Sequence, residues 1–231
     1  MANKYRDDAY CVRKFWTKKI DFEAPPSQDI AREMDRYIDW YNQSLHHKPK
    51  LTGPVRAALA HLHFECIHPF EDGNGRVGRA FAEKALSEDL GKPVLLSLSS
   101  TINKNKKQYY EALTTASRPQ INITPWIEYF VKTVHQSQLD AKEQVNFVLQ
   151  KAKFWQRHQD FLNTRQEKVL ARIFKEGPAG FVGGINAQKY MKIAACSKAS
   201  ATRDLAELLE RACLYQLPGG GRNTSYALLL L

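Results

Sequence analysis

Long apolar runs are missing from this sequence of 231 residues. No stretch reaches the roughly 18 apolar residues of a membrane-spanning helix, so no membrane span is expected. The first eight residues are polar, which predicts no secretory signal. The four cysteines are Cys11, Cys66, Cys196 and Cys213, and their spacing matches neither zinc ligands nor a disulfide framework. These absences together predict a cytoplasmic protein with reduced thiols.

The charge is positive and unevenly distributed. Hydrophobic residues make up 43% and charged residues 25% of the chain, as in soluble globular proteins, and the formal net charge is +10. From Phe161 onward, ten Lys and Arg residues stand against five Asp and Glu residues. An anionic partner is therefore expected, and a nucleotide, a nucleic acid and an acidic protein all remain candidates.

The pattern of apolar residues predicts a mainly helical fold. Residues from about 10 to 22 mix β-branched and aromatic side chains with basic ones, which predicts a β-hairpin that turns near Thr17–Lys19. Helices are expected from residue 27, over about 52–67, 74–90 and 103–116, and from 124 to about 160 with a break near Leu139 and Asp140. Residues 161–231 predict three short helices and a hairpin, the order of a winged helix-turn-helix domain.

The most informative stretch is His68–Arg79, which reads HPFEDGNGRVGR. Gly73 and Gly75 allow a close approach of a ligand to the backbone, and they stand where a helix is expected to begin. The free N–H groups and the positive end of that helix can hold an anion. Arg76 and Arg79 are three residues apart on the same helix face, and arginine binds phosphate by paired hydrogen bonds.

Two further residues of this stretch add chemistry to the anion site. Asp72 is a hard oxygen ligand beside it, which suits Mg²⁺ held together with phosphates. His68 titrates near neutrality and can act as a general base. A Gly-Asn-Gly turn and a solvated arginine are each common, but a base, a metal ligand, an anion nest and two arginines in one loop favour a phosphate-binding catalytic site.

This stretch resembles the signature of the Fic family, HPFxDGNGRxxR, and all nine fixed positions are present. The resemblance runs from about Phe22 to the C-terminus and is similar to the bacterial subgroup that carries a C-terminal winged helix, through Ser197–Leu205 and Pro218–Arg222. It implies a Fic-type helical core over residues 1–160 with a β-hairpin flap, followed by a winged helix over 161–231.

The resemblance also implies an activity, the transfer of AMP from Mg-ATP to a Ser, Thr or Tyr hydroxyl of a target protein. His68 would be the base that deprotonates the hydroxyl, and Asp72 would bind Mg²⁺ with the phosphates. Gly73, Asn74 and Gly75 would form the anion hole. Arg76 and Arg79 would hold the β- and γ-phosphates. The removal of AMP, the transfer of another nucleotide and a kinase-like use of the loop remain alternatives.

Two further sites follow from the resemblance. Tyr109 and Tyr110 fall where family members line the nucleoside pocket, and Tyr110 is the better candidate, with core packing as the alternative reading. The hairpin over residues 10–22 corresponds to a flap that docks the target protein as an added strand. An ordinary edge hairpin is the alternative for that segment.

One departure from the family concerns inhibition. Many Fic proteins carry a helix with the pattern Ser/Thr-x-x-x-Glu-Gly/Asn, whose glutamate pairs with the second arginine of the signature, here Arg79. No match occurs, because Glu176-Gly177 has Arg172 at the hydroxyl position. Compared with the family, the sequence begins just before the flap, and the portion that usually holds the inhibitory helix is either naturally absent or supplied by another chain. Because no glutamate stands in the required pattern, constitutive activity of this chain is expected. Glu71 and Glu83 are the acidic residues that could instead meet Arg79.

The C-terminal domain offers a second function. Lys198, Arg203 and Arg211 on its third helix and Arg222 on the wing could contact DNA phosphates, which predicts a DNA-binding regulator as the alternative to an enzyme. The same helix carries Asp204, Glu207 and Glu210, which is unusual for a groove-facing helix. Packing or homodimer formation is therefore an equal alternative for this domain. The other histidines, among them His61 and His63, are expected to be core or solvated residues.

Overall fold

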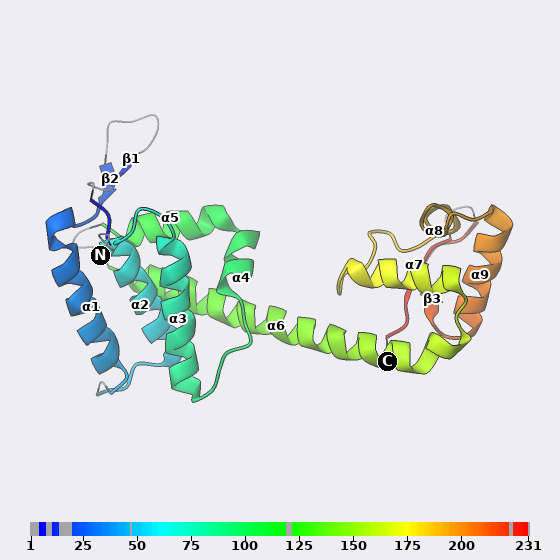
Figure 1. Cartoon of the computed structure of the whole chain (residues 1–231), viewed down its shortest axis with the longest axis horizontal. Helices are drawn as coiled ribbons and strands as arrows, with labels where there is room; N and C mark the ends of the chain where they lie inside the picture. Colours follow the sequence, from blue (N-terminus) through cyan, green and yellow to red (C-terminus); the bar gives the residue numbers. More distant parts are fainter. Residues whose placement is uncertain are drawn as a thin grey trace. The chain divides into compact units, whose positions relative to one another are not determined.

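The computed structural model describes residues 5–7, 11–13, 20–46, 48–118, 122–221 and 224–230 (Figure 1). The expected turn at Thr17–Lys19 and the candidate residue Arg222 lie outside this part of the chain. The chain divides into two compact units, Met1–Ala141 and Lys142–Leu231. Helix α6, Thr124–His158, contributes residues to both units, and the expected boundary at residue 160 falls just after its end.

Unit 1 is a packed set of helices with a short hairpin. Its helices are α1 (Ile30–Ser44), α2 (Gly53–Ile67), α3 (Asn74–Leu90), α4 (Leu98–Lys104), α5 (Lys106–Ala116) and the first part of α6, and a 3₁₀ turn, Ser27–Asp29, precedes α1. Strand β1 (Cys11–Arg13) pairs antiparallel with β2 (Ile20–Glu23). The expectation of a mainly helical fold with an N-terminal hairpin is therefore confirmed.

Helix α2 lies at the centre of this unit and is buried on nearly every side. Ala57, Ala58 and Ala60 are fully buried, and such small side chains let neighbouring helices come close. Two buried aromatic side chains reach its backbone, since the Trp126 indole donates to the Ala58 carbonyl at 2.9 Å and the Tyr37 hydroxyl donates to that of Ala60 at 3.2 Å. The end of α2, where His68 follows, is thus attached to a core that other helices hold on several sides.

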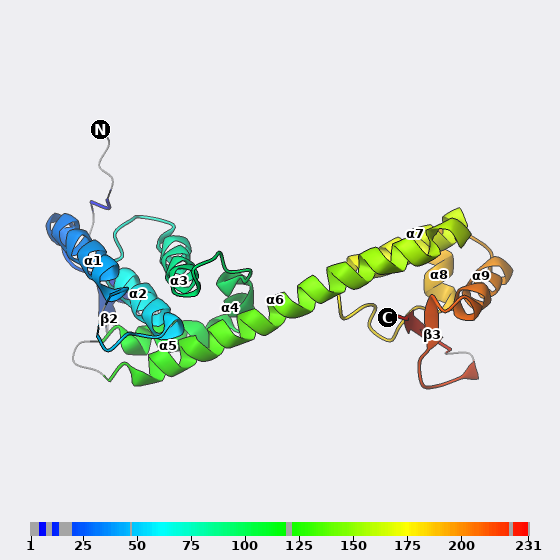
Figure 2. The same ribbon diagram turned by 90° about the horizontal axis from the view of Figure 1, so that it is seen from below.

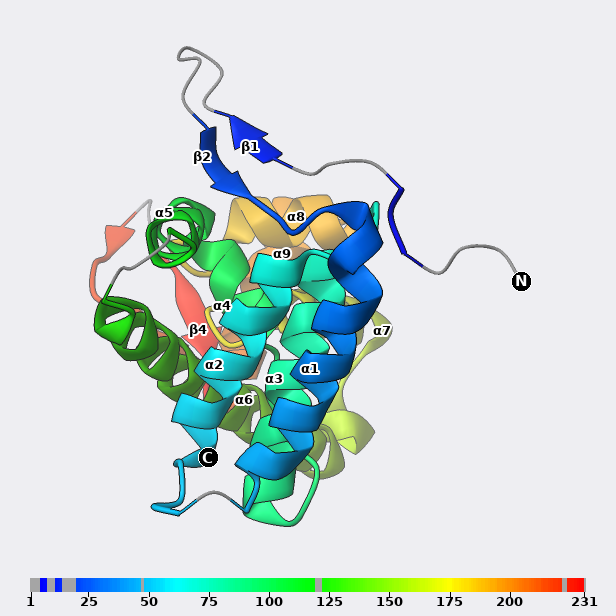
Figure 3. The same ribbon diagram turned by 90° about the vertical axis from the view of Figure 1, so that its left-hand side faces the viewer.

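The hairpin lies at the end of the helices where α2 stops and α3 begins (Figures 1 and 3). Its register pairs Cys11 with Glu23 and Val12 with Phe22, and it is irregular between Val12 and Arg13. Each of the two strands has one edge without a pairing strand in the two-stranded sheet. The hairpin therefore borders the same end of the unit as the His68–Gly73 loop.

Two expectations about helix boundaries were wrong. The single helix expected over 103–116 is divided at Asn105, whose backbone (φ −142°, ψ 59°) leaves the helical region between α4 and α5. Helix α4 also begins earlier, because the Ser97 side chain caps it by accepting from the Ser100 N–H. Ser97 is a local N-cap signal for this helix, which the pattern of apolar residues alone does not reveal.

The break expected near Leu139 and Asp140 does not occur, and α6 runs without interruption (Figure 2). The Asp140 carboxylate accepts hydrogen bonds from Thr101 and Lys104 and from Gln136, one turn earlier. A polar residue that neighbouring side chains satisfy does not compete for the helix backbone, so the helix continues. No helix in the described part of the chain has both the length and the apolar character needed to cross a membrane.

Unit 2 contains α7 (Thr164–Lys175), α8 (Ala187–Ala194) and α9 (Lys198–Glu210), followed by strands β3 (Leu214–Gln216) and β4 (Tyr226–Leu228). The two strands pair antiparallel, so the expected order of three helices and a hairpin is present. Asn163 forms a capping box with Gln166 at α7, and Ser197 caps α9. These polar caps explain why the helices begin where the sequence places them.

Candidate active site

The loop between α2 and α3 turns sharply at both of its ends. His68 ends α2 in the left-handed conformation (φ 49°), and Gly73 begins α3 in the same region (φ 89°). At Gly73 this conformation favours glycine, since a side chain would be strained there. The two turns place the residues from His68 to Arg79 around the beginning of one helix.

The side chain of Asn74 bridges the main chain of this loop at Phe70. Its side chain is buried, its Oδ1 accepts from the Phe70 N–H at 2.9 Å, and its Nδ2 donates to the Phe70 carbonyl at 2.6 Å. The Phe70 ring packs against the core near Phe64, with 6.2 Å between the ring centroids. The side chain of Asn74 therefore serves the shape of the loop, and its backbone N–H is the group that lies at the start of α3.

Arg6 hydrogen-bonds the main chain of the same loop, although it lies 62 residues before His68. Its backbone N–H donates to the Pro69 carbonyl and its Nε to the His68 carbonyl, at 2.9 Å and 2.8 Å. Its guanidinium also donates to the Pro25 carbonyl just after β2. Arg6 is 3% exposed, so it is a buried cation whose hydrogen bonds join the loop to the base of the hairpin.

Replacing Arg6 by alanine should loosen this loop. Hydrogen bonds from a charged donor contribute about 1.5–3 kcal/mol, so unit 1 should lose stability of that order. Thermal unfolding and hydrogen exchange of residues 68–75 would measure both effects. Arg32→Ala, which removes an exposed arginine, is the control, and equal behaviour of the two variants would show that Arg6 does not hold the loop.

The imidazole of His68 lies in a mostly buried position. Burial lowers its pKa below the ordinary value, a hydrogen bond to the Glu65 main chain raises it, and the charge of Arg6 lowers it. Its Nδ1 lies 3.7 Å from Oε2 of Glu65. With Nδ1 turned to the Glu65 acceptors, Nε2 is the nitrogen that can accept a proton, and a lowered pKa favours the neutral ring that a general base requires.

The beginning of α3 presents backbone N–H donors and exposed charged side chains. The first N–H groups of a helix have no hydrogen-bond partner within that helix. In α3 these are the N–H groups of Asn74 and Gly75. Asp72 and Arg76 are both highly exposed and form an ion pair at 2.9 Å. Within the described residues no group of three acidic, histidine or cysteine side chains could hold a metal ion. Asp72 therefore offers a single carboxylate, which fits a Mg²⁺ ion that takes its other ligands from phosphates and water.

Arg79, one turn further on, is oriented by side chains of neighbouring helices. Its Nε donates to the Ser99 hydroxyl at 2.7 Å, and burial raises the pKa of the nearby Tyr109 while the charge of Arg79 lowers it. Glu83 does not meet it, because its Oε1 accepts from the Leu98 N–H at 3.1 Å. A Cβ on Gly75 would lie 3.1 Å from Arg79 Nη1, so the guanidinium lies directly beside the glycine of the anion nest.

The two tyrosines of α5 differ in exposure. Tyr109 is buried, and its hydroxyl lies 2.8 Å from Nε2 of His61, in the core of the unit. Tyr110 is 60% exposed and packs edge-on against Tyr109, with 5.1 Å between the ring centroids. Tyr110 is thus the ring of this pair that a ligand could reach, while His61 is a buried core histidine.

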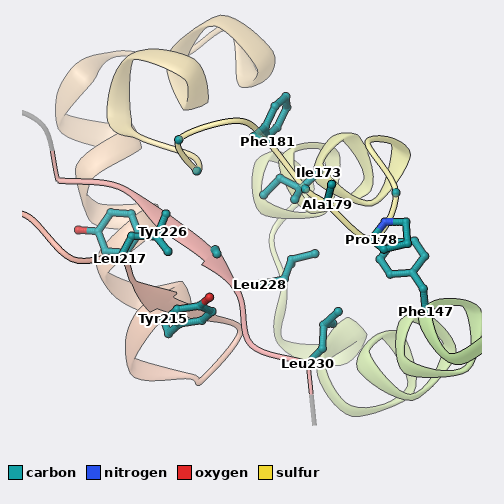
Figure 4. Close-up of a pocket in the computed structure, with 15 residues that line it drawn as sticks. Phe147, Ile173, Pro178, Ala179, Phe181, Tyr215, Leu217, Tyr226, Leu228 and Leu230 are labelled. Carbon is teal, nitrogen blue, oxygen red and sulfur yellow. The ribbon is translucent and has the colours of Figure 1, made fainter. Parts of the chain in front are cut away.

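The candidate DNA-binding residues Lys198 and Arg203 belong to unit 2 and are exposed on α9. The same unit has a cavity of about 280 Å³ between the end of α7 and the β3–β4 hairpin (Figure 4). Its lining is mainly apolar, with side chains such as Ile173, Phe181 and Leu228, and includes no charged residue. This cavity therefore lacks the arginine or lysine side chains that bind phosphate most strongly.

Sequence reasoning missed three residues that shape the site: Arg6, Ser99 and Glu65. Nothing in the sequence marks Arg6 or Ser99, since both act over long sequence separations. Glu65 had a signal, because it is the only acidic residue of α2 and follows Phe64 in an otherwise apolar run three residues before His68.

The comparisons with known proteins match the part of the chain that contains the His68–Arg79 loop. The model of the Fic/DOC family matches residues 2–86. The protein adenylyltransferase Fic of Nematostella vectensis is 30% identical over 122 residues, which cover 52% of this chain and 26% of that protein. The protein of the same name from Drosophila willistoni is 34% identical over 110 residues, 46% of this chain and 19% of that one. The chain thus spans about a quarter or less of the length of these curated relatives.

A solved structure extends the likeness in fold. A Fic family protein from Desulfovibrio desulfuricans superposes with a TM-score of 0.50 and 21% sequence identity, covering 97% of this chain and 62% of that one. At this identity the likeness concerns the fold alone. It includes most of both units, and so it covers the C-terminal residues that the family model leaves out.

Proposed function

Because the chain belongs to the Fic/DOC family through residues 2–86, we propose that it is a protein adenylyltransferase, which transfers AMP from Mg-ATP to a Ser, Thr or Tyr hydroxyl of a target protein. The observation that carries the proposal is the loop from α2 to α3, which presents a neutral histidine, free helix N–H groups and arginines at one end of unit 1. The names of the matching relatives agree with this activity.

In the proposed reaction, Nε2 of His68 takes the proton of the target hydroxyl. The hydroxyl oxygen then bonds to the α-phosphorus of ATP, and the bond from that phosphorus to the pyrophosphate oxygen breaks. The N–H groups of Gly73, Asn74 and Gly75 would stabilise the phosphate charge that builds up, as in an oxyanion hole. The lowered pKa of His68 supports its role as the base.

The remaining phosphates would meet charged side chains. Arg79 would clamp a terminal phosphate, and its hydrogen bond to Ser99 would hold it in place before ATP binds. Arg76 would exchange its exposed ion pair with Asp72 for phosphate oxygens. Mg²⁺ bound by Asp72 would supply neutralisation of the phosphate charge. Tyr110, the exposed ring, is the proposed wall of the nucleoside pocket.

The target protein is proposed to dock on the β1–β2 hairpin. Both strands have an unpaired edge, and an extended segment can add to such an edge through main-chain hydrogen bonds. The hairpin borders the loop that carries His68, and Arg6 joins the two. A hydroxyl on the docked segment could therefore reach the base.

Incubation with ATP labelled at the α-phosphate, or in parallel at the γ-phosphate, tests the proposed reaction. Retention of the α-label on the chain itself or on a protein of a cell lysate is expected, with release of pyrophosphate. Retention of only the γ-label would indicate phosphoryl transfer. Labelling by another nucleotide, or loss of AMP from a pre-modified protein, would favour the other family chemistries.

DNA binding by unit 2 is the second candidate, and one observation favours it. Two of the three acidic residues of α9 do not face solvent freely, since Asp204 is 2% exposed and paired with Arg165, and Glu207 pairs with Arg211. The exposed surface of the first turns of α9 therefore carries Lys198 and Arg203. With three helices and a hairpin in this unit, we propose a winged helix that meets DNA phosphates through that surface.

Changing Lys198 and Arg203 together to alanine should weaken binding to duplex DNA. The plot of log affinity against log salt should become shallower by about one unit for each lost phosphate contact. A mobility-shift titration at several salt concentrations measures this slope. The control changes the exposed Lys142 and Lys153 of α6 to alanine, and a full-length chain that binds no DNA at low salt would leave packing or a homodimer as the role of unit 2.

A further inference from the structure

Glu65 is an acidic residue enclosed in the interior of unit 1. Its side chain is 8% exposed, and it lies on α2 one turn before His68. Its Oε2 lies 3.7 Å from Nδ1 of His68, which is longer than a hydrogen bond but within the range of an ion pair. Its Oε1 is fully buried and has no hydrogen-bond partner within the described residues. A carboxylate in such a position is costly to keep unless a nearby charge compensates it.

An opposite charge that partly offsets burial comes from Arg79 on α3. A Cβ placed on Gly75 would lie 3.1 Å from Arg79 Nη1 and 3.8 Å from Glu65 Oε1, so both groups border that glycine. A Cβ on Gly78 would lie 2.9 Å from the same Oε1, which shows that the glycine leaves the room the carboxylate needs. Glu65 therefore has His68 near its Oε2, and its Oε1 borders the same glycine as Arg79.

The charged and titratable groups around Glu65 come from three helices. They are His61 and Cys66 on α2, His68 at its end, Arg79 on α3 and Tyr109 on α5. Burial lowers the pKa of His61 to about 4, and burial raises the pKa of Tyr109, so both remain neutral at pH 7. Burial raises the pKa of Glu65 to about 7, against the opposing effect of Arg79.

We propose that Glu65 is a positioning residue of this site, which stabilises the positive charge that His68 acquires when it takes a proton from the target hydroxyl. The proposal rests on the proposed adenylyl transfer. As Nε2 of His68 takes the proton, Nδ1 keeps its own, and the ring becomes an imidazolium 3.7 Å from the carboxylate. The opposite charge strengthens the base at the moment of transfer, and the charge of Arg79 opposes the effect of burial, which favours the neutral carboxyl of Glu65.

The ring titration of His68 in the full-length protein tests the proposal without depending on activity. In the wild type, a proton taken up near pH 7 should be shared between Glu65 and His68. In Glu65→Gln, His68 should titrate alone and at lower pH, and Glu65→Asp should restore part of the difference. Histidine-ring NMR across pH 4.5–8.5 measures these midpoints. The exposed Glu111→Gln is the matched control.

Kinetics supply the second readout. Glu65→Gln should lower kcat for AMP transfer by about tenfold or more with little change in KM for ATP, and the acid limb of its pH profile should move to lower pH. An unchanged His68 titration in a folded Glu65→Gln protein would overturn the proposal and leave Glu65 as a counter-ion of Arg79. A wild type without AMP transfer would instead overturn the proposed function, since the ring titration would still report on Glu65.

Discussion

Replacing His68 by alanine is expected to lower the rate of AMP transfer by at least about 10²-fold while leaving ATP affinity nearly unchanged. A positioned general base contributes about 10²–10⁴-fold to the rate of a proton transfer, and alanine removes that group completely. In the proposed mechanism the imidazole acts on the target hydroxyl, whereas the helix N–H groups and the arginines bind the phosphates. Labelling rates and a nucleotide-binding titration separate the two effects.

The control for this substitution is His135→Ala, which removes an exposed histidine of α6 and should leave the rate unchanged. Since only the neutral imidazole accepts a proton, kcat should fall as the pH is lowered below neutrality. Burial holds the pKa of His68 below its ordinary value, so the neutral form prevails at pH 7. Transfer at the wild-type rate by purified His68→Ala would remove the base from the mechanism.

The second large effect is expected in unit 2, where Asp204→Ala should reduce stability by about 3 kcal/mol. Asp204 is 2% exposed and accepts two hydrogen bonds from Arg165, at 2.8 Å and 3.0 Å, and one from the Tyr190 hydroxyl at 2.9 Å. Removing one member of a buried ion pair leaves its partners unsatisfied, which costs about 3–5 kcal/mol when both charges are enclosed. The partial exposure of Arg165 places the expected loss at the lower end of that range.

Hydrogen exchange of α7–α9 in the full-length protein, with α2–α3 as the internal reference, would measure this loss. Glu210→Ala, an exposed acidic residue of the same helix, is the matched control. Protection in unit 2 that is the same in both variants would show that the buried carboxylate contributes little.

The stability of unit 2 should also depend on pH through Asp204. Burial raises the pKa of Asp204, but the hydrogen bonds from Arg165 and Tyr190 outweigh that effect and hold it below the ordinary value. A depressed folded-state pKa gives stability that is complete above the unfolded value of about 4 and is lost as the pH falls through the folded value. Asp204→Asn should lack this acid-dependent loss, and unfolding at pH 2–7 would show the difference.

Much of the fold could be predicted from the sequence where the signals are local. The order of three helices and a hairpin in unit 2 followed from its apolar pattern, and the candidate site followed from residues that lie together in His68–Arg79. The features that the sequence did not predict depend on tertiary contacts. The continuity of α6 depends on Asp140 bonding to Thr101 and Lys104, which are distant in the sequence.

The candidate site shows the same division. The residues proposed to bind phosphate were visible as a motif, but the side chains that orient them were not. Arg6 reaches the His68 carbonyl from 62 residues away, and Ser99 reaches Arg79 from 20 residues away. The inward direction of Asp204 was also missed, since composition counts an acidic residue without showing which way it points.

The buried amide of Asn74 has a consequence for how this protein can change. One side chain satisfies both the N–H and the carbonyl of Phe70, which requires a donor and an acceptor on the same planar group. Aspartate at this position would present a second acceptor to the carbonyl, and serine would be too short to bridge both. A substitution at residue 74 therefore reshapes the loop that carries His68 unless it supplies both hydrogen bonds, so one position links the stability of the fold to the geometry of the candidate site.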